Sequence, residues 1–167
     1  MPILPVPDRV YRSVLDIDPR ALAKEGIKLL LADLDNTLTR YGQSDPDQAV
    51  VAWRSALREA GVELFLLSNS RRPNRVRHYA QALDIPVLGH AGKPSPAGYH
   101  SAMEQMGRTP DETAMVGDQI FTDILGAKRA GVTALLVEPI ALRGNPGRYL
   151  RYALEIPFRA AGKKRSG

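Results

Sequence analysis

Short runs of apolar residues alternate along the chain with segments in which apolar residues recur every three or four positions. Each run ends in polar residues, and the runs cover positions 27–34, 63–67, 86–88, 113–116 and 133–137. Continuous apolar runs of this length are typical of strands buried on both faces of a parallel sheet. The pattern therefore predicts a sheet of five parallel strands.

The segments between these runs have the spacing of helices that bury one face. They cover residues 45–60, 73–83, 96–106 and 118–131, with Asp45 or Asp47 as the first cap and Gly61 as the first stop. Strands and helices in strict alternation predict an α/β fold with three αβα layers and right-handed crossovers. In such sheets the active site lies beyond the carboxyl ends of the strands.

The two ends of the chain do not follow this alternation of strands and helices. Prolines at positions 2, 5 and 7 predict an extended arm over about residues 1–24. Residues 145–161 predict a final helix within a basic tail, about 145–167, and Pro157 should weaken its last turn. Its apolar stripe could pack on the sheet or lie on a membrane, and we expect packing. The stripe consists of Tyr149, Leu150, Ala153, Leu154 and Phe158.

Composition narrows the class of protein. The 167 residues predict one domain, and 44% apolar with 25% charged residues is ordinary for a globular protein. The chain has no cysteine, which excludes disulfides, thiolate-bound zinc and cysteine nucleophiles, and which is compatible with the cytosol. No apolar run approaches the roughly 20 residues of a membrane span, and residues 1–5 do not resemble a secretory signal. We therefore expect a cytoplasmic protein.

The net charge of +5 is concentrated near the end of the chain. After Leu142, one acid, Glu155, stands among seven basic residues: Arg143, Arg148, Arg151, Arg159, Lys163, Lys164 and Arg165. Such a segment suits an anionic partner, which could be RNA, an acidic membrane surface or a phosphorylated substrate. A solvated terminus that only aids solubility is the alternative.

Acidic residues follow two of the predicted strands. Asp33 and Asp35 lie two positions apart after the first run, so both side chains should point to the same face. Two carboxylates in an apolar setting repel each other, and a divalent cation such as Mg²⁺ relieves that repulsion. Asp118 follows the fourth run and is the candidate third carboxylate, with Asp123 about one helical turn later.

Four short motifs resemble those of the haloacid dehalogenase hydrolases. They are Asp33-Leu34-Asp35-Asn36-Thr37-Leu38, Leu67-Ser68-Asn69, Lys93-Pro94 and the segment Val116 to Asp123, which contains Gly117-Asp118. All four follow the family's order, and the resemblance spans residues 27–137. It implies the family's Rossmann-like fold and a phosphatase that uses Mg²⁺.

The resemblance also implies a role for each residue. Asp33 would attack phosphorus to form an aspartyl-phosphate, and Asp35 would serve as general acid and then base. Ser68 and the backbone amide of Asn69 would bind phosphoryl oxygens, with Thr37 holding the turn. Lys93 would neutralise charge. Mg²⁺ would bind Asp33, the carbonyl of Asp35 and Asp118, with Asp123 beyond these direct ligands.

Neither gap in which relatives carry a cap domain is long enough here to hold one, so we expect an open site. The finer resemblance, which includes Gly26-Ile27-Lys28 and Asn145-Pro146-Gly147-Arg148, is to the YqeG-type branch and to mitochondrial phosphatidylglycerophosphate phosphatases. An RNA- or ribosome-associated protein with a vestigial site is the alternative function. The substrate, the oligomeric state and the choice between hydrolysis and phosphotransfer stay open.

Overall fold

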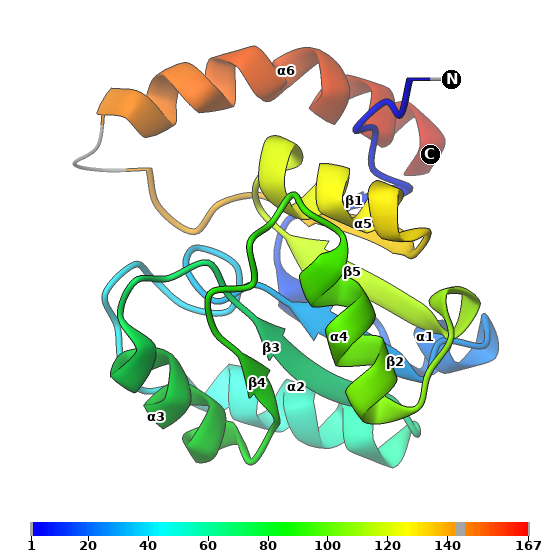
Figure 1. Cartoon of the computed structure of the whole chain (residues 1–167), viewed down its shortest axis with the longest axis vertical. Helices are drawn as coiled ribbons and strands as arrows, with labels where there is room; N and C mark the ends of the chain where they lie inside the picture. The colour runs from blue at the N-terminus through cyan, green and yellow to red at the C-terminus, as the bar shows by residue number, and fades with distance from the viewer. Residues whose placement is uncertain (1, 143–145, 167) are drawn as a thin grey trace.

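In the computed structural model, which describes residues 2–142 and 146–166, six parallel strands form one sheet. Their spatial order is β1-β6-β5-β2-β3-β4, so β2 and β5 lie at the centre (Figure 1). The strands are β1 (Arg9–Tyr11), β2 (Leu29–Ala32), β3 (Glu63–Leu67), β4 (Val87–Leu88), β5 (Thr113–Gly117) and β6 (Thr133–Val137). The α/β fold with three layers predicted from the pattern is confirmed.

The central strands are apolar throughout because both of their faces are covered. Leu30 and Ala32 of β2 pack with one hydrophobic cluster, whereas Leu29 and Leu31 pack with another on the opposite face. The first cluster includes residues of α1 (Pro19–Lys24), α2 (Gln48–Glu59) and α3 (Pro73–Leu83). The second includes residues of α4 (Ala97–Met106), the π-helix η3 (Ile120–Ile124) and α5 (Leu125–Ala130).

The first 24 residues form more structure than an extended arm. They contain β1, the short 3-10 helix η1 (Val14–Asp16) and α1, which begins at a proline after the capping residue Asp18. Strand β1 pairs with β6 in parallel, so that Arg9 lies opposite Leu135. The sheet therefore has one more strand than the apolar runs predicted, because this short edge strand carries only one aliphatic residue.

The last helix, α6 (Pro146–Ser166), differs from the prediction in two ways. It continues through Pro157, and most of its apolar stripe points away from the protein, with only Phe158 packing inward against Phe121. Asn145 and Arg143 lie outside the described residues. We call the following exposed residues the outer face of α6: Tyr149, Leu150, Ala153, Leu154, Ile156 and Pro157.

The carboxyl ends of β2, β3 and β5 lie side by side, and the motif residues follow these ends. Within the described residues, no helix or strand is inserted between β2 and α2, and only α3 and β4 separate β3 from Lys93. The expected absence of a cap domain is thus confirmed for this part of the chain. The edge of the sheet is left open to solvent.

Candidate active site

Lys93 connects two carboxylates at the carboxyl edge of the sheet. Its Nζ lies 2.9 Å from Oδ1 of Asp33 and 2.7 Å from Oδ1 of Asp123. All three side chains are buried, and the lysine side chain is only 2% exposed. An ammonium in this position can neutralise charge on Asp33 and on any anion bound beside it.

Asp118 completes a group of three buried carboxylates. One oxygen each from Asp33, Asp118 and Asp123 lies within 4.8 Å of the other two. The hydroxyl of Thr37 donates to Oδ1 of Asp118 at 3.1 Å. This bond links the loop after β2, where Thr37 lies, to the loop after β5.

Asp123 lies on a π-helix that brings its carboxylate back toward the strand end. Its Oδ2 accepts from the backbone amide of Gln119 at 3.1 Å. A Cβ at Gly117 would lie 2.3 Å from the Asp123 carboxylate, so only glycine fits there. The hydroxyl of Tyr99 donates to the Asp123 carbonyl at 2.9 Å. Asp123 therefore lies in the same group of carboxylates as Asp33 and Asp118, and whether it binds a metal directly or from beyond the direct ligands stays a prediction.

The three carboxylates carry more negative charge than Lys93 can balance. Burial, and to a lesser degree Asp123, raises the pKa of Asp33 to about 6, although Lys93 opposes the shift. Burial together with Asp33 and Asp123 raises the pKa of Asp118 well above its usual range. Burial alone would lower the pKa of Lys93, but Asp123 and Asp33 outweigh it and raise that pKa.

These residues fit a hard divalent cation. The donor atoms are carboxylate oxygens, which Mg²⁺ prefers, and their close spacing is costly without a cation. Burial is the main cause of the raised pKa values of Asp33 and Asp118, and the neighbouring carboxylates add to both shifts. The structure therefore supports a metal site formed by Asp33, Asp118 and Asp123.

Asp35 lies apart from this group and pairs with an arginine of α3. Its Oδ1 is 2.8 Å from Nη2 of Arg75, and both side chains are largely buried. The Nε of Arg75 donates to the carbonyl of Gln43 at 2.9 Å. The arginine thus fixes Asp35 relative to the loop that follows β2, and it leaves the carboxylate at the wall of the pocket.

Ser68 and Asn69 follow β3 and have different partners. The buried Oγ of Ser68 accepts from the amide of Ser70 at 3.1 Å. The side chain of Asn69 makes two bonds with the backbone of Lys93: it donates to the carbonyl at 2.9 Å and accepts from the amide at 3.0 Å. Asn69 therefore holds the lysine-bearing loop in place, and Ser68 lines the pocket beside Asp33.

The mouth of the site is basic. A pocket of about 260 Å³ opens above Asp33 and Asp35, and its outer wall includes Arg71, Arg72 and Arg148. The guanidinium of Arg148 lies 5.0 Å from the ring centre of Tyr41, and that of Arg72 lies 5.9 Å from it. Two cations close to this ring would attract an anionic substrate.

Helix α6 contacts the metal-site loop through a buried ion pair. The carboxylate of Glu155 pairs with Arg159 at 2.7 Å and accepts from the amide of Ile120 at 2.9 Å. Arg159 in turn donates to the backbone carbonyl of Asp118. The loop that carries Asp118 is therefore held from outside by the last helix.

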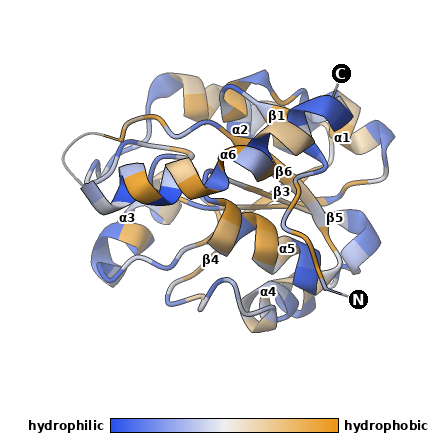
Figure 2. Cartoon of the chain, turned by 90° about the horizontal axis from the view of Figure 1, so that it is seen from above, coloured by the Kyte–Doolittle hydropathy of each residue, from blue (hydrophilic) through white to orange (hydrophobic). Residues whose placement is uncertain are grey.

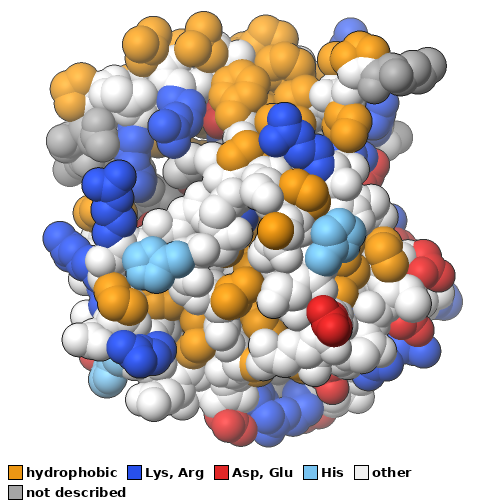
Figure 3. All heavy atoms as spheres, viewed as in Figure 1, with side chains coloured by type: hydrophobic (Ala, Val, Ile, Leu, Met, Phe, Trp, Pro, Cys, Tyr) orange, Lys and Arg blue, Asp and Glu red, His pale blue; other side chains and the backbone are white. Residues whose placement is uncertain are grey.

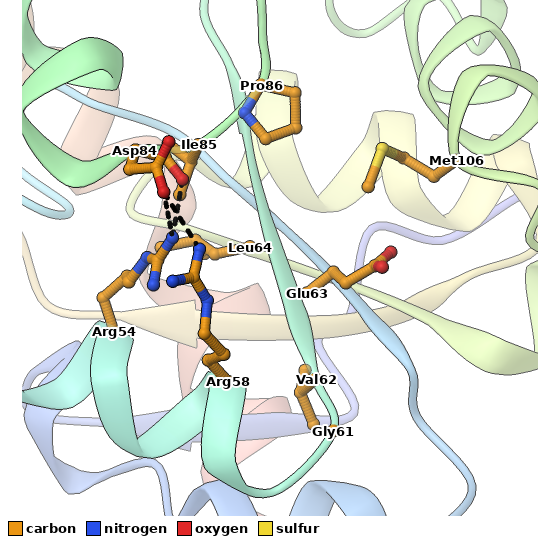
Figure 4. Close-up of a pocket in the computed structure, with 10 residues that line it drawn as sticks. All are labelled: Arg54, Arg58, Gly61, Val62, Glu63, Leu64, Asp84, Ile85, Pro86 and Met106. Atoms are coloured by element: carbon orange, nitrogen blue, oxygen red, sulfur yellow. Dashed lines mark hydrogen bonds and ion pairs between the residues drawn. The ribbon is translucent and has the colours of Figure 1, made fainter.

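A second cavity, of about 380 Å³, lies at the opposite end of the sheet, where β3 begins (Figure 4). Its two arginines, Arg54 and Arg58, both face Asp84, at 3.6 and 3.1 Å. Burial, with help from Arg58, lowers the pKa of Arg54. The two cations are thus already paired within the protein, and the cavity lies far from the carboxylate group.

Several residues of the site were not singled out by the sequence. Tyr41 lines the mouth but belongs to no motif, and Gln119, which also lines it, lies inside the fourth motif but had no role assigned to it. Arg75 was visible only as one of four arginines after β3, with no sign that it pairs with Asp35. Glu155 did carry a signal, because it is the single acid in a basic segment.

Comparison with known proteins points to one family. Residues 47–131 match the sequence model of the haloacid dehalogenase-like hydrolases. The chain is 29% identical over 136 residues to the probable phosphatase YqeG of Bacillus subtilis, which covers 81% of this chain and 78% of that protein. It is 30% identical over 151 residues to the chloroplastic phosphatidylglycerophosphate phosphatase 1 of Chlamydomonas reinhardtii. That match covers 86% of this chain but only 56% of the algal protein.

A solved structure has the same fold. The 4-nitrophenylphosphatase of Thermotoga maritima superposes with a TM-score of 0.59 at 14% identity, covering 77% of this chain and 92% of that one. At this identity the likeness concerns the fold. Ser68, Lys93, Asp118 and Asp123 all lie inside the segment matched by the family model, whereas Asp33 and Asp35 precede it.

Proposed function

This chain belongs to the haloacid dehalogenase-like hydrolases, and from that premise we propose that it is a Mg²⁺-dependent phosphomonoester phosphatase with an aspartyl-phosphate intermediate. The observation that carries the proposal is the buried group of Asp33, Asp118, Asp123 and Lys93 at the open carboxyl edge of the sheet. Its curated relatives named above are phosphatases.

In the first step, a carboxylate oxygen of Asp33 attacks the phosphorus of the monoester. A new oxygen–phosphorus bond forms, and the bond from phosphorus to the substrate oxygen breaks. Asp35 gives a proton to the departing alkoxide, which leaves as an alcohol. Lys93 stabilises the negative charge that remains on Asp33 and on the transferring group.

In the second step, water cleaves the aspartyl-phosphate. Asp35, now a carboxylate, takes a proton from the water molecule while the water oxygen attacks phosphorus. The bond between phosphorus and the Asp33 oxygen breaks. The products are inorganic phosphate and the original Asp33 carboxylate. Ser68 and the amide of Asn69 bind the phosphoryl oxygens in both steps. Held by Asp33, Asp118 and Asp123, Mg²⁺ would supply charge neutralisation.

We further propose that the substrate is a phosphate ester whose bulk stays outside the pocket, such as phosphatidylglycerophosphate. The absence of a cap over the described residues leaves room for a large leaving group. Arg71, Arg72 and Arg148 at the mouth suit a substrate with additional negative charge. The algal relative is named for this lipid, although the chain spans only about half of that protein.

The alternative, an RNA- or ribosome-associated protein with a vestigial site, has less support. Asp35 is present and is fixed by Arg75. A protein that only binds RNA has no use for a proton donor at that position, so Asp35 counts against this alternative. The basic residues Arg72 and Arg148 gather at the pocket itself, which suits an anionic substrate.

Phosphate release from two substrates tests both parts of the proposal. Wild type should hydrolyse p-nitrophenyl phosphate with Mg²⁺ and lose this activity in EDTA. Asp33→Asn should lower kcat by a factor of roughly a thousand or more while the circular dichroism spectrum is unchanged. The exposed Asp45→Asn is the matched control and should retain full activity.

The substrate class is tested separately with phosphatidylglycerophosphate in detergent micelles and with small sugar phosphates. A higher kcat/KM for the lipid supports the lipid class. Preference for the sugar phosphates would refute that class but leave the phosphatase assignment intact. Turnover by Asp33→Asn equal to that of wild type would refute the assignment itself.

A further inference from the structure

The outer face of α6 is the largest run of exposed apolar side chains on one described element. Leu150 is 66% exposed, Leu154 is 61% exposed, and Tyr149 and Ile156 are each 52% exposed. Figure 3 shows hydrophobic side chains gathered along α6 at the top of the molecule, and Figure 2 looks down on the same helix. Exposed apolar residues that cluster in this way are typical of an interaction surface.

The helix cannot turn this face inward, because residues of its opposite face are buried and bound to the rest of the protein. Glu155 and Arg159 are buried and are bound to the backbone of Ile120 and Asp118. Farther along, a Cβ at Gly162 would lie 2.3 Å from the ring of Pro7, so the helix packs closely on the N-terminal segment. The polar contacts that hold the helix therefore leave its apolar stripe outside.

The surroundings of the outer face are basic. Arg151, Lys163, Lys164 and Arg165 are exposed on the same helix. Its only acid, Glu155, is buried in the ion pair with Arg159 and does not offset the surface charge. A long helix with one apolar face and exposed cations beside it is typical of helices that lie in the interface of an anionic bilayer.

The outer face also begins beside the mouth of the active site. Arg148, which lines the mouth and lies over Tyr41, directly precedes Tyr149 and Leu150. Tyr41 itself is 62% exposed. A surface that received the outer face of α6 would therefore also lie close to the pocket above Asp33.

We propose that the outer face of α6 docks the protein on an anionic lipid bilayer, with Leu150, Leu154 and Ile156 in the interface and the cations of the helix near lipid phosphates. This inference rests on the proposed lipid substrate class, and it adds the surface by which the protein would reach such a substrate. Among the described residues no helix has the length and hydropathy to cross a bilayer, so the contact is peripheral.

Two other occupants fit the surface less well. RNA would use the cations, but it offers no partner for the aliphatic side chains of Leu150, Leu154 and Ile156. A second copy of the chain could cover these side chains, but a symmetric contact would bring the two sets of cations toward each other. An anionic bilayer accommodates both the apolar face and the positive charge.

Vesicle co-sedimentation tests the docking surface without turnover. The probes are vesicles of phosphatidylcholine alone and vesicles with about one third phosphatidylglycerol, at a lipid concentration that spans the partition midpoint. Wild type should bind the anionic vesicles, and Leu150→Gln/Leu154→Gln should bind them at least roughly tenfold more weakly. Lys164→Gln/Arg165→Gln should also weaken binding roughly tenfold, and the loss should shrink in high salt.

Leu15→Gln is the matched control, because Leu15 is also exposed but lies on η1, which packs against α2. It should bind vesicles like wild type. The Leu150 and Leu154 variant should hydrolyse p-nitrophenyl phosphate normally, which separates this test from that of the catalytic assignment. Circular dichroism verifies that each variant is folded.

Three results would overturn the docking proposal. One is equal vesicle binding by wild type and the Leu150→Gln/Leu154→Gln variant. Another is binding of a single-stranded oligonucleotide, measured by fluorescence anisotropy, with no binding to anionic vesicles. The third is a dimer by light scattering that the same substitutions dissociate, since the outer face would then be covered by a second copy.

Discussion

The ammonium nitrogen of Lys93 lies 2.9 Å from the carboxylate oxygen of Asp33, although 60 positions separate the two residues in the chain. Both groups are buried, and the same nitrogen reaches Asp123. The lysine therefore serves two purposes in one position: it offsets the charge of two buried carboxylates, and it faces the oxygen that we propose as the nucleophile.

Lys93→Met should separate these two roles. Removing the cation leaves Asp33 and Asp123 buried without their partner, which should destabilise the metal-free protein by about 3 kcal/mol. Mg²⁺ should recover part of that stability, because it supplies positive charge to the same oxygens. Activity should stay low in Mg²⁺, since the methionine cannot stabilise the transferring phosphoryl group.

Urea unfolding in EDTA and in Mg²⁺, together with initial rates on p-nitrophenyl phosphate, measures both effects. Lys24→Met, at an exposed position of α1, is the matched control and should resemble wild type in both assays. Full activity of Lys93→Met in Mg²⁺ would remove the lysine from the proposed chemistry.

The effect of Mg²⁺ on stability should depend on pH. An unfolded Asp loses its proton near pH 4, whereas burial raises the pKa of folded, metal-free Asp33 to about 6. The stability that this group contributes is therefore fully present below pH 4, and it is lost as the pH rises through 6. Mg²⁺ replaces the proton, so it should raise the Tm more at pH 7.5 than at pH 5.

Differential scanning fluorimetry at the two pH values, with Mg²⁺ or EDTA, measures this difference. Asp118→Asn removes one of the three carboxylates, so it should be more stable than wild type in EDTA and should gain less from Mg²⁺. A Mg²⁺-induced rise in Tm that is the same at both pH values, or the same in Asp118→Asn, would contradict the proposed metal site.

The loss of kcat in Arg75→Gln should depend on the leaving group of the substrate. Arg75 fixes the Asp35 carboxylate at 2.8 Å, and Asp35 is the proposed proton donor. An alkyl leaving group needs that proton, whereas p-nitrophenolate leaves readily without it. The variant should therefore lose about tenfold more kcat on glycerol 3-phosphate than on p-nitrophenyl phosphate.

Arg77→Gln is the control for this comparison, because Arg77 lies on the same helix and donates to the side chain of Asn74, three positions before it on that helix. It should leave the ratio of the two rates unchanged. If Arg75→Gln lowers both rates by the same factor, the arginine acts on binding or folding and not through Asp35.

Glu155→Gln should weaken the link between α6 and the metal site. The substitution removes the charge that Arg159 needs in a buried position, and Arg159 contacts the carbonyl of Asp118. We expect a loss of about 3 kcal/mol in stability and a roughly tenfold rise in the Mg²⁺ concentration that gives half-maximal activity. The exposed Glu104→Gln should change neither quantity. An unchanged Mg²⁺ requirement would show that α6 does not support the site.

The strands could be predicted because β2, β3, β5 and β6 are buried on both faces, which leaves a continuous apolar run in the sequence. Strand β1 could not, since Arg9, Val10 and Tyr11 are half-buried at an edge and form a strand only by pairing with β6. The orientation of α6 also escaped prediction. The rule that an apolar stripe faces the core fails where a buried Glu155–Arg159 pair takes the inner side.

For the site, parallel strands predict that residues after their carboxyl ends meet, and the structure brings Asp33, Asp118, Asp123 and Lys93 together. Their catalytic roles stay predictions. The partners of individual side chains were beyond the sequence: the contact of Thr37 with Asp118, and that of Asn69 with Lys93, depend on how three loops pack. Arg75 is one of several nearby arginines, and only the geometry distinguishes it.

The pairing of β1 with β6 has a consequence for how the chain acquires its shape. The contact between Asp8 and Ala134 joins positions 126 residues apart, so β1 emerges from the ribosome long before its partner exists. Until the two meet, the outer border of β6 exposes unpaired amides and carbonyls that could recruit another nascent chain. The three residues of β1 cover this border of β6 in the folded protein, so we expect variants that loosen β1 to be recovered mainly in inclusion bodies.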